Sequence, residues 1–144
     1  MSTTLYEKDY YLWLEETVQL LREGKLRELD VSNLIEEIED MGKSEKKAIK
    51  SNSRILLMHL LKWKYQPNKR SKSWKSSIIE HRKRIRDSFE DSPSLKVYFA
   101  DNFDLCYQDA KELAAAETEL PIDKFPVQCP FSKKDTLRTD YLPE

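Results

Sequence analysis

The stretch from Val31 to about Tyr65 constrains the fold more than any other part of the sequence. It contains no proline, and its apolar residues recur at three- and four-residue spacings, the period of a helix with one buried face. Those residues are Leu34, Ile38, Met41, Ala48, Ile49, Ile55, Leu56, Leu60 and Trp63. Gly42 interrupts the pattern, because glycine weakens a helix by about 1 kcal/mol relative to alanine. We predict either one long helix here or two helices bent at Gly42.

Three other segments show the same helical period: YEKDYYLWLEETVQLLREG, SWKSSIIEHRKRIRDSFED and LKVYFADNFDLCYQDAKELAAAETEL. Typical capping residues flank them and the long helix. These are Gly24 after the first segment, Asp30 before the long helix, Ser71 or Ser73 before the third helix, and Ser92 with Pro93 before the fourth.

The last part of the chain, residues 121–144, combines prolines with the apolar anchors Phe125, Val127 and Phe131. A capping box from Ser132 to Asp135 indicates a short helix within it. The chain has 144 residues but only two glycines, too few for the repeated tight turns of a β-sandwich. We therefore predict an all-α protein with one domain, 1–144. It is a compact up-and-down bundle of four main helices, 5–120, with a long second helix and an ordered Pro-containing C-terminal strap, 121–144.

Several common features are missing from the sequence. The N-terminal residues lack the basic and apolar regions of a signal peptide, and no window reaches the roughly 18 apolar residues of a membrane span, so we expect a cytoplasmic protein that binds no membrane. Cys106 and Cys129 are far apart in the sequence, so we expect both to be free, reduced thiols. Neither His59 nor His81 has a glutamate three residues before it, so we predict no bundle-type metal site and no cofactor.

Charge is distributed unevenly along the chain. Residues 1–42 carry four basic and eleven acidic groups, residues 43–86 fifteen and two, and residues 87–144 six and thirteen, which gives net charges of −7, +13 and −7. Flanking charge of nearly equal size favours pairing of the basic segment within the protein over an external polyanion site.

A nucleic acid is the alternative partner of the basic third helix. The candidate polyanion-binding residues are Arg70, Lys75, Arg82, Lys83, Arg84 and Arg86. Clustered cations bind phosphate, and an exposed Trp74 could stack on a base. However, Trp74 falls on the apolar stripe of its helix, which predicts that it is buried.

His59 stands in the apolar run RILLMHLLKW. Glu45, Asn52 and His59 are seven residues apart and nearly align on a helix, so we predict a polar network between helices that contains them. The functional alternative makes His59 a catalytic acid or base, with Lys62 as a nearby cation.

Arg54 and His59 match the R-x4-6-H spacing of the HEPN ribonuclease superfamily. That resemblance would make them an RNA-cleaving pair that needs no metal. On an ideal helix their side chains point about 140° apart, so they converge only across a symmetric interface or around a bent helix.

Several ordered strings, including LDVSNLIEEIEDMGKSEKKA, LLMHLLKWKYQP, RSKSW and FPVQCP, resemble the bacterial domain-of-unknown-function family 29 over nearly residues 5–144. The resemblance implies an all-α cytoplasmic protein and no particular activity. The family pattern retains MHLLKW and SW, which singles out His59, Lys62, Trp63 and Trp74, and it does not include Arg54.

We therefore favour a non-enzymatic helical module that binds a macromolecular partner, a protein or a second copy rather than a nucleic acid, in a regulatory or interaction role. The alternative is a toxin-like, metal-independent ribonuclease that uses His59 with Arg54 or Lys62.

Overall fold

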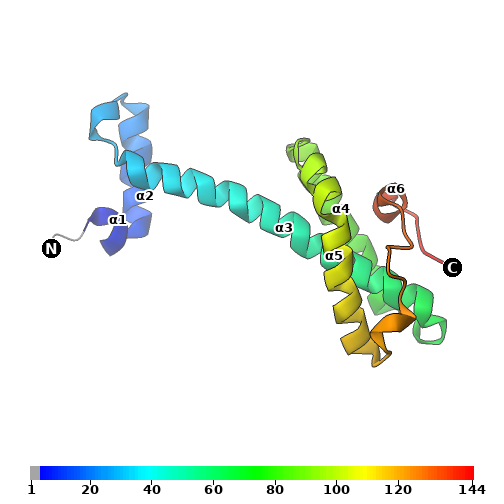
Figure 1. Cartoon of the computed structure of the whole chain (residues 1–144). Helices are drawn as coiled ribbons and strands as arrows, with labels where there is room; N and C mark the ends of the chain where they lie inside the picture. The colour runs from blue at the N-terminus through cyan, green and yellow to red at the C-terminus, as the bar shows by residue number, and fades with distance from the viewer. Residues whose placement is uncertain (1–3) are drawn as a thin grey trace. The chain divides into compact units, whose positions relative to one another are not determined.

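The computed structural model describes residues 4–144, and all of its regular secondary structure over that range is helical. The elements are α1 (Leu5–Lys8), α2 (Tyr10–Arg22), η1 (Leu26–Glu28), α3 (Val31–Tyr65), η2 (Pro67–Lys69), α4 (Lys72–Asp91), α5 (Leu95–Thr118), η3 (Ile122–Lys124) and α6 (Lys133–Leu137), and Figure 1 shows their order. The predicted all-α bundle with a long second helix is confirmed.

The chain divides into two compact units, the first ending at Ser44 and the second running from Glu45 to Glu144. Helix α3 contributes residues to both. The prediction that residues 1–144 form one domain stays a prediction.

The first unit begins with two helices where the sequence predicted one. Asp9 has a φ of −151°, which is not helical, and its carboxylate accepts a hydrogen bond of 3.1 Å from the amide of Leu12. The side chain of Asp9 therefore caps α2 and ends α1. Gly24 ends α2 at a φ of +71°, as predicted from its freedom to adopt left-handed backbone angles.

Helix α3 is continuous, so the single-helix alternative is correct. It begins after Asp30, which caps it as predicted, because the carboxylate of Asp30 accepts a hydrogen bond of 3.3 Å from the amide of Asn33. It passes through Gly42 without a break and ends at Tyr65, before Pro67.

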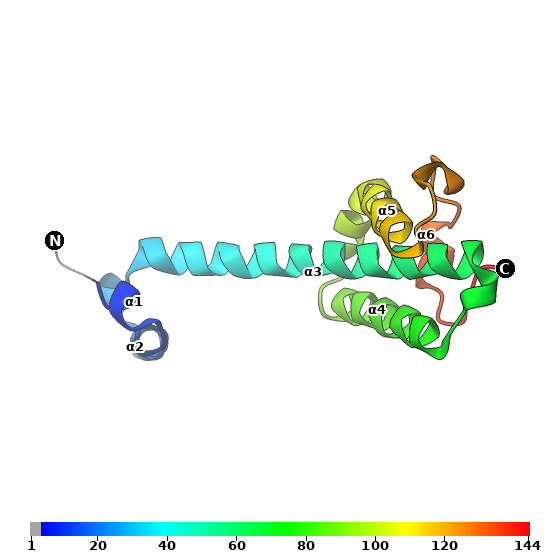
Figure 2. The same ribbon diagram turned by 90° about the horizontal axis from the view of Figure 1, so that it is seen from below.

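In the second unit, α4 and α5 pack against the later part of α3 (Figures 1 and 2). The fully buried side chains there include Leu56, Leu60, Ile78, Ile85 and Tyr107. The core of this unit therefore comes from the helical-period positions of three helices.

Two predicted features of the second unit are wrong in detail. Helix α5 starts at Leu95 after the cap residue Ser94, two residues later than predicted, because Ser92 still serves as the C-terminal cap of α4. Trp74 is half-buried rather than buried, at the first turn of α4, where Ser71 provides the cap.

The C-terminal strap contributes to the core of the second unit. Phe125 and Phe131 are buried, and the hydroxyl of Tyr107 donates to the carbonyl of Pro126 at 2.6 Å. Ser132 caps α6 as predicted. Val127 was expected to be a further anchor, but it is 81% exposed.

Candidate functional site

His59 lies half-buried on α3 and faces α4. Its Nδ1 is 3.0 Å from the carbonyl oxygen of Ile55 and 3.4 Å from Oγ of Ser77. The same hydroxyl is 3.2 Å from Nδ1 of His81, which also lies 2.8 Å from the carbonyl oxygen of Ser77. Burial lowers the pKa of His59, and the nearby Lys62 ammonium lowers it further. His59 is therefore a neutral, partnered group at neutral pH.

We predicted that His59 shares a polar network with Glu45 and Asn52. The hydrogen-bond partners of His59 are instead the carbonyl of Ile55 and the hydroxyl of Ser77. Residues seven apart on a helix align, but they are about 10 Å apart along the axis, too far for side chains to bond directly. Glu45 is exposed and Asn52 is half-buried.

Lys62 is the most buried lysine of the site, with 7% of its surface exposed. Its ammonium lies 4.6 Å from the ring centre of Trp74 on α4 and 3.5 Å from Oε1 of Glu117 on α5. It therefore joins α3 to both neighbouring helices through a cation–π contact and an ion pair.

Trp63 is covered by Arg70, whose guanidinium carbon is 5.0 Å from the ring centre and whose Nε donates to the carbonyl of Trp63 at 2.9 Å. The residues of MHLLKW and SW thus contact one another or their neighbours at the junction of α3 with α4. This arrangement gives them a role in holding helices together.

Arg54 does not meet His59. Its guanidinium lies 3.9 Å from the carboxylate of Asp109 on α5, whereas His59 contacts Ser77 on α4. The two predicted members of a ribonuclease pair therefore have partners on different helices.

The predicted polyanion-binding residues do not form one cationic face. Arg82 is only 2% exposed and donates to carbonyl oxygens of the C-terminal strap. Arg86 donates to the carbonyl of Leu137 at 2.8 Å, and Arg84 forms an ion pair with Glu80 at 2.9 Å. These three arginines of α4 thus find their hydrogen-bond or ion-pair partners within the second unit.

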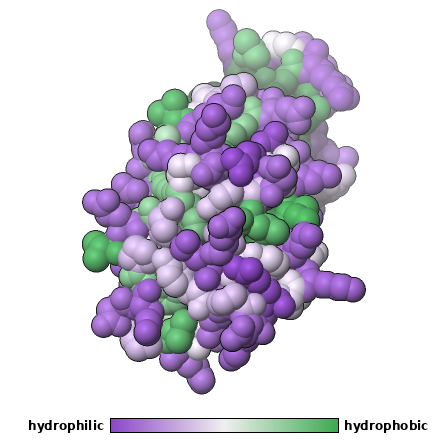
Figure 3. Space-filling view, turned by 90° about the vertical axis from the view of Figure 1, so that its right-hand side faces the viewer, coloured by the Kyte–Doolittle hydropathy of each residue, from purple (hydrophilic) through white to green (hydrophobic). Residues whose placement is uncertain are grey.

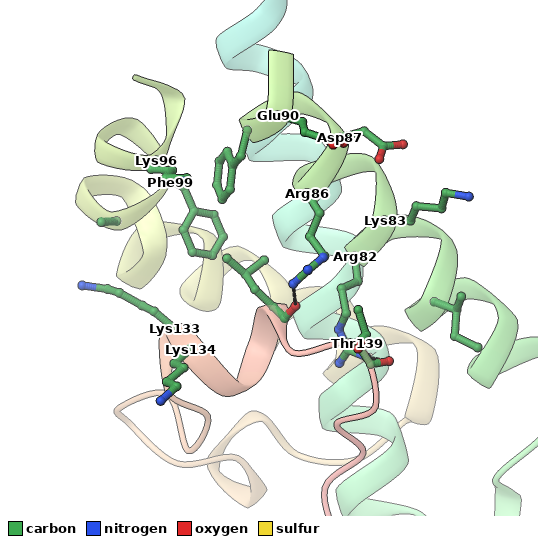
Figure 4. A pocket seen from close by; sticks show the side chains of 14 residues that line it. Arg82, Lys83, Arg86, Asp87, Glu90, Lys96, Phe99, Lys133, Lys134 and Thr139 are labelled. Atoms are coloured by element: carbon green, nitrogen blue, oxygen red, sulfur yellow. Dashed lines mark hydrogen bonds between the residues drawn. The ribbon is translucent and has the colours of Figure 1, made fainter. Parts of the chain in front are cut away.

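A groove of about 870 Å³ lies between α4, α5 and α6, and we refer to it as the α4–α6 groove. Its apolar lining consists of Ile79, Phe89, Phe99, Ala100 and Leu137. Its basic lining consists of Arg82, Lys83, Arg86, Lys96, Lys133 and Lys134, and its acidic lining of Asp87 and Glu90. Figure 4 shows Phe99 between lysines of α6 and charged residues of α4.

Of these basic groups, the sequence predicted those on α4 as polyanion-binding residues, but not Lys96, Lys133 and Lys134. Within residues 4–144, neither Lys83 nor any of these three lysines makes an ion pair within 4.0 Å. Lys133 and Lys134 follow the predicted Ser132 cap as a basic pair, but nothing in the sequence connects this pair to α4.

No group of three or more histidine, cysteine, aspartate or glutamate side chains that could hold a metal ion occurs in the described part of the chain. Burial raises the pKa of the Cys129 thiol to about 11, so this cysteine is a poor nucleophile at neutral pH. Among residues 4–144 there is also no helix long and apolar enough to cross a membrane.

Comparison with known proteins gives a match to a protein family. The family model described as "Domain of unknown function DUF29" matches residues 5–142. No curated protein and no solved structure matches the chain.

Proposed function

The chain belongs to the DUF29 family, and we propose that it is a protein-binding module of the bacterial cytoplasm whose α4–α6 groove takes an acidic amphipathic helix of its partner. The observation that carries the proposal is the lining of this groove, apolar in its centre and bordered by lysines that make no ion pair within residues 4–144.

The apolar lining supports a protein partner. Ile79 is 50% exposed and Leu137 is half-buried, so both offer surface that the apolar face of a helix would cover, as in helix-in-groove recognition. The face of the molecule in Figure 3 is mostly hydrophilic, with small hydrophobic patches between its polar side chains. An apolar groove on a largely polar surface is typical of an interaction site.

The charges of the groove select the kind of helix. Lysines come from three different helices, so a bound helix would meet cations on more than one side. Carboxylates on the flanks of that helix would match them. Asp87 and Glu90 also line the groove, so its charge is mixed rather than uniformly positive, whereas the continuous phosphates of a nucleic acid favour a uniformly cationic surface.

A designed peptide tests the proposal. The probe is a fluorescent amphipathic helix with leucines on one face and glutamates beside them, and its anisotropy is measured as the full chain is added. We expect binding that weakens with added salt, because rim charges are screened. The same peptide with lysines in place of glutamates, and a single-stranded RNA, should bind at least tenfold more weakly.

Two variants locate the binding site. Lys83→Glu combined with Lys134→Glu reverses charge on two sides of the groove and should weaken binding of the acidic peptide about tenfold or more. The control is Lys75→Glu, an exposed position on the same α4 that does not line the groove. Equal affinity in the double variant and the control, or tighter binding of RNA than of the acidic peptide, would refute the proposal.

A further inference from the structure

The first unit leaves an aliphatic stripe of α3 open. Val31, Ile35, Ile38 and Met41 are 53%, 51%, 58% and 62% exposed. At about 100° per residue these four side chains fall within an arc of about 120°, so they share one face of the helix. Such a face is normally covered by another surface.

Acidic side chains accompany this stripe. Glu36, Glu39 and Asp40 are exposed on the same stretch of α3. Glu37 is already engaged within the first unit, because it accepts hydrogen bonds from the hydroxyls of Tyr6 and Tyr10. Residues 31–43 therefore form an acidic amphipathic helix, and we refer to them as the acidic segment.

From this match of chemistry we infer that the α4–α6 groove is occupied by the acidic segment of a second copy of this chain. The inference rests on the proposed function and names its partner. The groove provides an apolar lining together with lysines, and the acidic segment provides an apolar stripe with Glu39 near its edge and a net negative charge. Burial of the aliphatic side chains drives association, and the opposite charges fix the partner and its orientation.

The charge distribution argues against the simpler pairing of two acidic segments with each other. Residues 1–44 carry five basic and eleven acidic groups. At about 100° per residue, Glu39 lies near the edge of the stripe, whereas Glu36 and Asp40 point toward the opposite face. A symmetric contact would therefore bring Glu39 close to its own copy and place two segments of net negative charge side by side, and like charges oppose association. Contact with the groove places Glu39, and the net negative charge of the segment, near lysines instead.

The inferred contact joins different surfaces of the two copies. Each copy offers one acidic segment and one groove, so two such contacts related by a two-fold axis would close a dimer. Self-association should depend on protein concentration and weaken as salt screens the charges.

Charge reversal tests the inference, with sedimentation velocity of the full chain as the measurement. Glu36→Lys with Glu39→Lys, and separately Lys83→Glu with Lys134→Glu, should each raise the dissociation constant of self-association about tenfold or more. Lys75→Glu should leave it unchanged. An equal mixture of the two double variants should associate again, since a lysine-bearing segment then meets a glutamate-bearing groove. Circular dichroism verifies that each variant keeps its helices.

Three outcomes would overturn the inference. The unmodified chain could remain monomeric at high concentration, the groove variant could associate as tightly as the unmodified chain, or the mixture could fail to re-associate. Its failure is distinguishable from failure of the proposed function, because binding of the designed acidic peptide is measured in a separate assay. If that peptide binds the groove while the chain stays monomeric, the partner is a different protein.

Discussion

Arg82 ties the C-terminal strap to α4, and its removal should be the most damaging single change at this contact. The guanidinium is 2% exposed. It donates to the carbonyl oxygens of Thr136 at 2.8 Å, Tyr141 at 2.9 Å and Thr139 at 3.3 Å. Arg82→Met keeps an unbranched apolar stem of similar reach and removes every one of these donors.

The magnitude follows from the number and kind of these bonds. A hydrogen bond from a charged group contributes about 1.5–3 kcal/mol, and two of the three bonds have good lengths of 2.8 and 2.9 Å. Burial of the guanidinium has a cost, which also lowers the pKa of Arg82, and methionine avoids that cost. We expect Arg82→Met to lower the free energy of unfolding by about 2–4 kcal/mol.

Urea unfolding followed by circular dichroism measures that loss, and amide hydrogen exchange locates it. Exchange should accelerate most in residues 136–144, where the freed carbonyls lie. Arg84→Met is the matched control, since Arg84 is exposed and pairs only with Glu80 one turn away, a contact of about 0.5 kcal/mol or less. Equal losses in the two variants, or unchanged exchange in the strap of Arg82→Met, would show that the buried guanidinium does not hold the strap.

Three further substitutions, all in α3, test other features of the structure. Gly42→Ala should stabilise the helix by about 1 kcal/mol in thermal unfolding, because an added Cβ meets nothing within 4 Å; a loss would contradict the continuous helix. Ser53→Ala should leave the urea midpoint unchanged or raise it, since the buried Oγ of Ser53 has no partner within the described residues; a large drop would reveal a hidden partner. The pKa of His59 is lowered in the folded state, so its contribution to stability is complete above the unfolded value of about 6.5 and decreases as pH falls toward the folded pKa. His59→Gln should therefore flatten the pH dependence of the urea midpoint below pH of about 6.5, and an unchanged slope would refute this assignment.

The helices could be predicted where local signals are strong. Val31 to Tyr65 has no proline and a consistent apolar period, and Asp30, Ser71 and Ser132 are side chains that cap free amides. The break at Asp9 was missed because its apolar neighbours keep the helical period across it. Only the backbone turn and the bond to Leu12 reveal that α2 begins there.

The candidate site was less predictable, because the partners of a side chain come from other helices. Periodicity predicted a polar network between helices around His59, but the sequence could not indicate that Ser77 of α4 would be its neighbour. The lysines of the α4–α6 groove are separated by up to 51 positions, from Lys83 to Lys134. Only the packing of three helices brings them to one groove.

Counting charges along the sequence does not show which groups the basic side chains contact. It treats acidic side chains as the partners of basic ones, and Arg54 and Lys62 do pair with carboxylates of α5. Arg82 and Arg86 instead donate to main-chain carbonyls of the strap, which every sequence contains and no composition reveals. Because a carbonyl carries no net charge, these arginines are held without using any acidic side chain. The acidic groups of residues 31–43 are therefore not required to neutralise them, as the inferred contact between the acidic segment and the groove of a second copy requires.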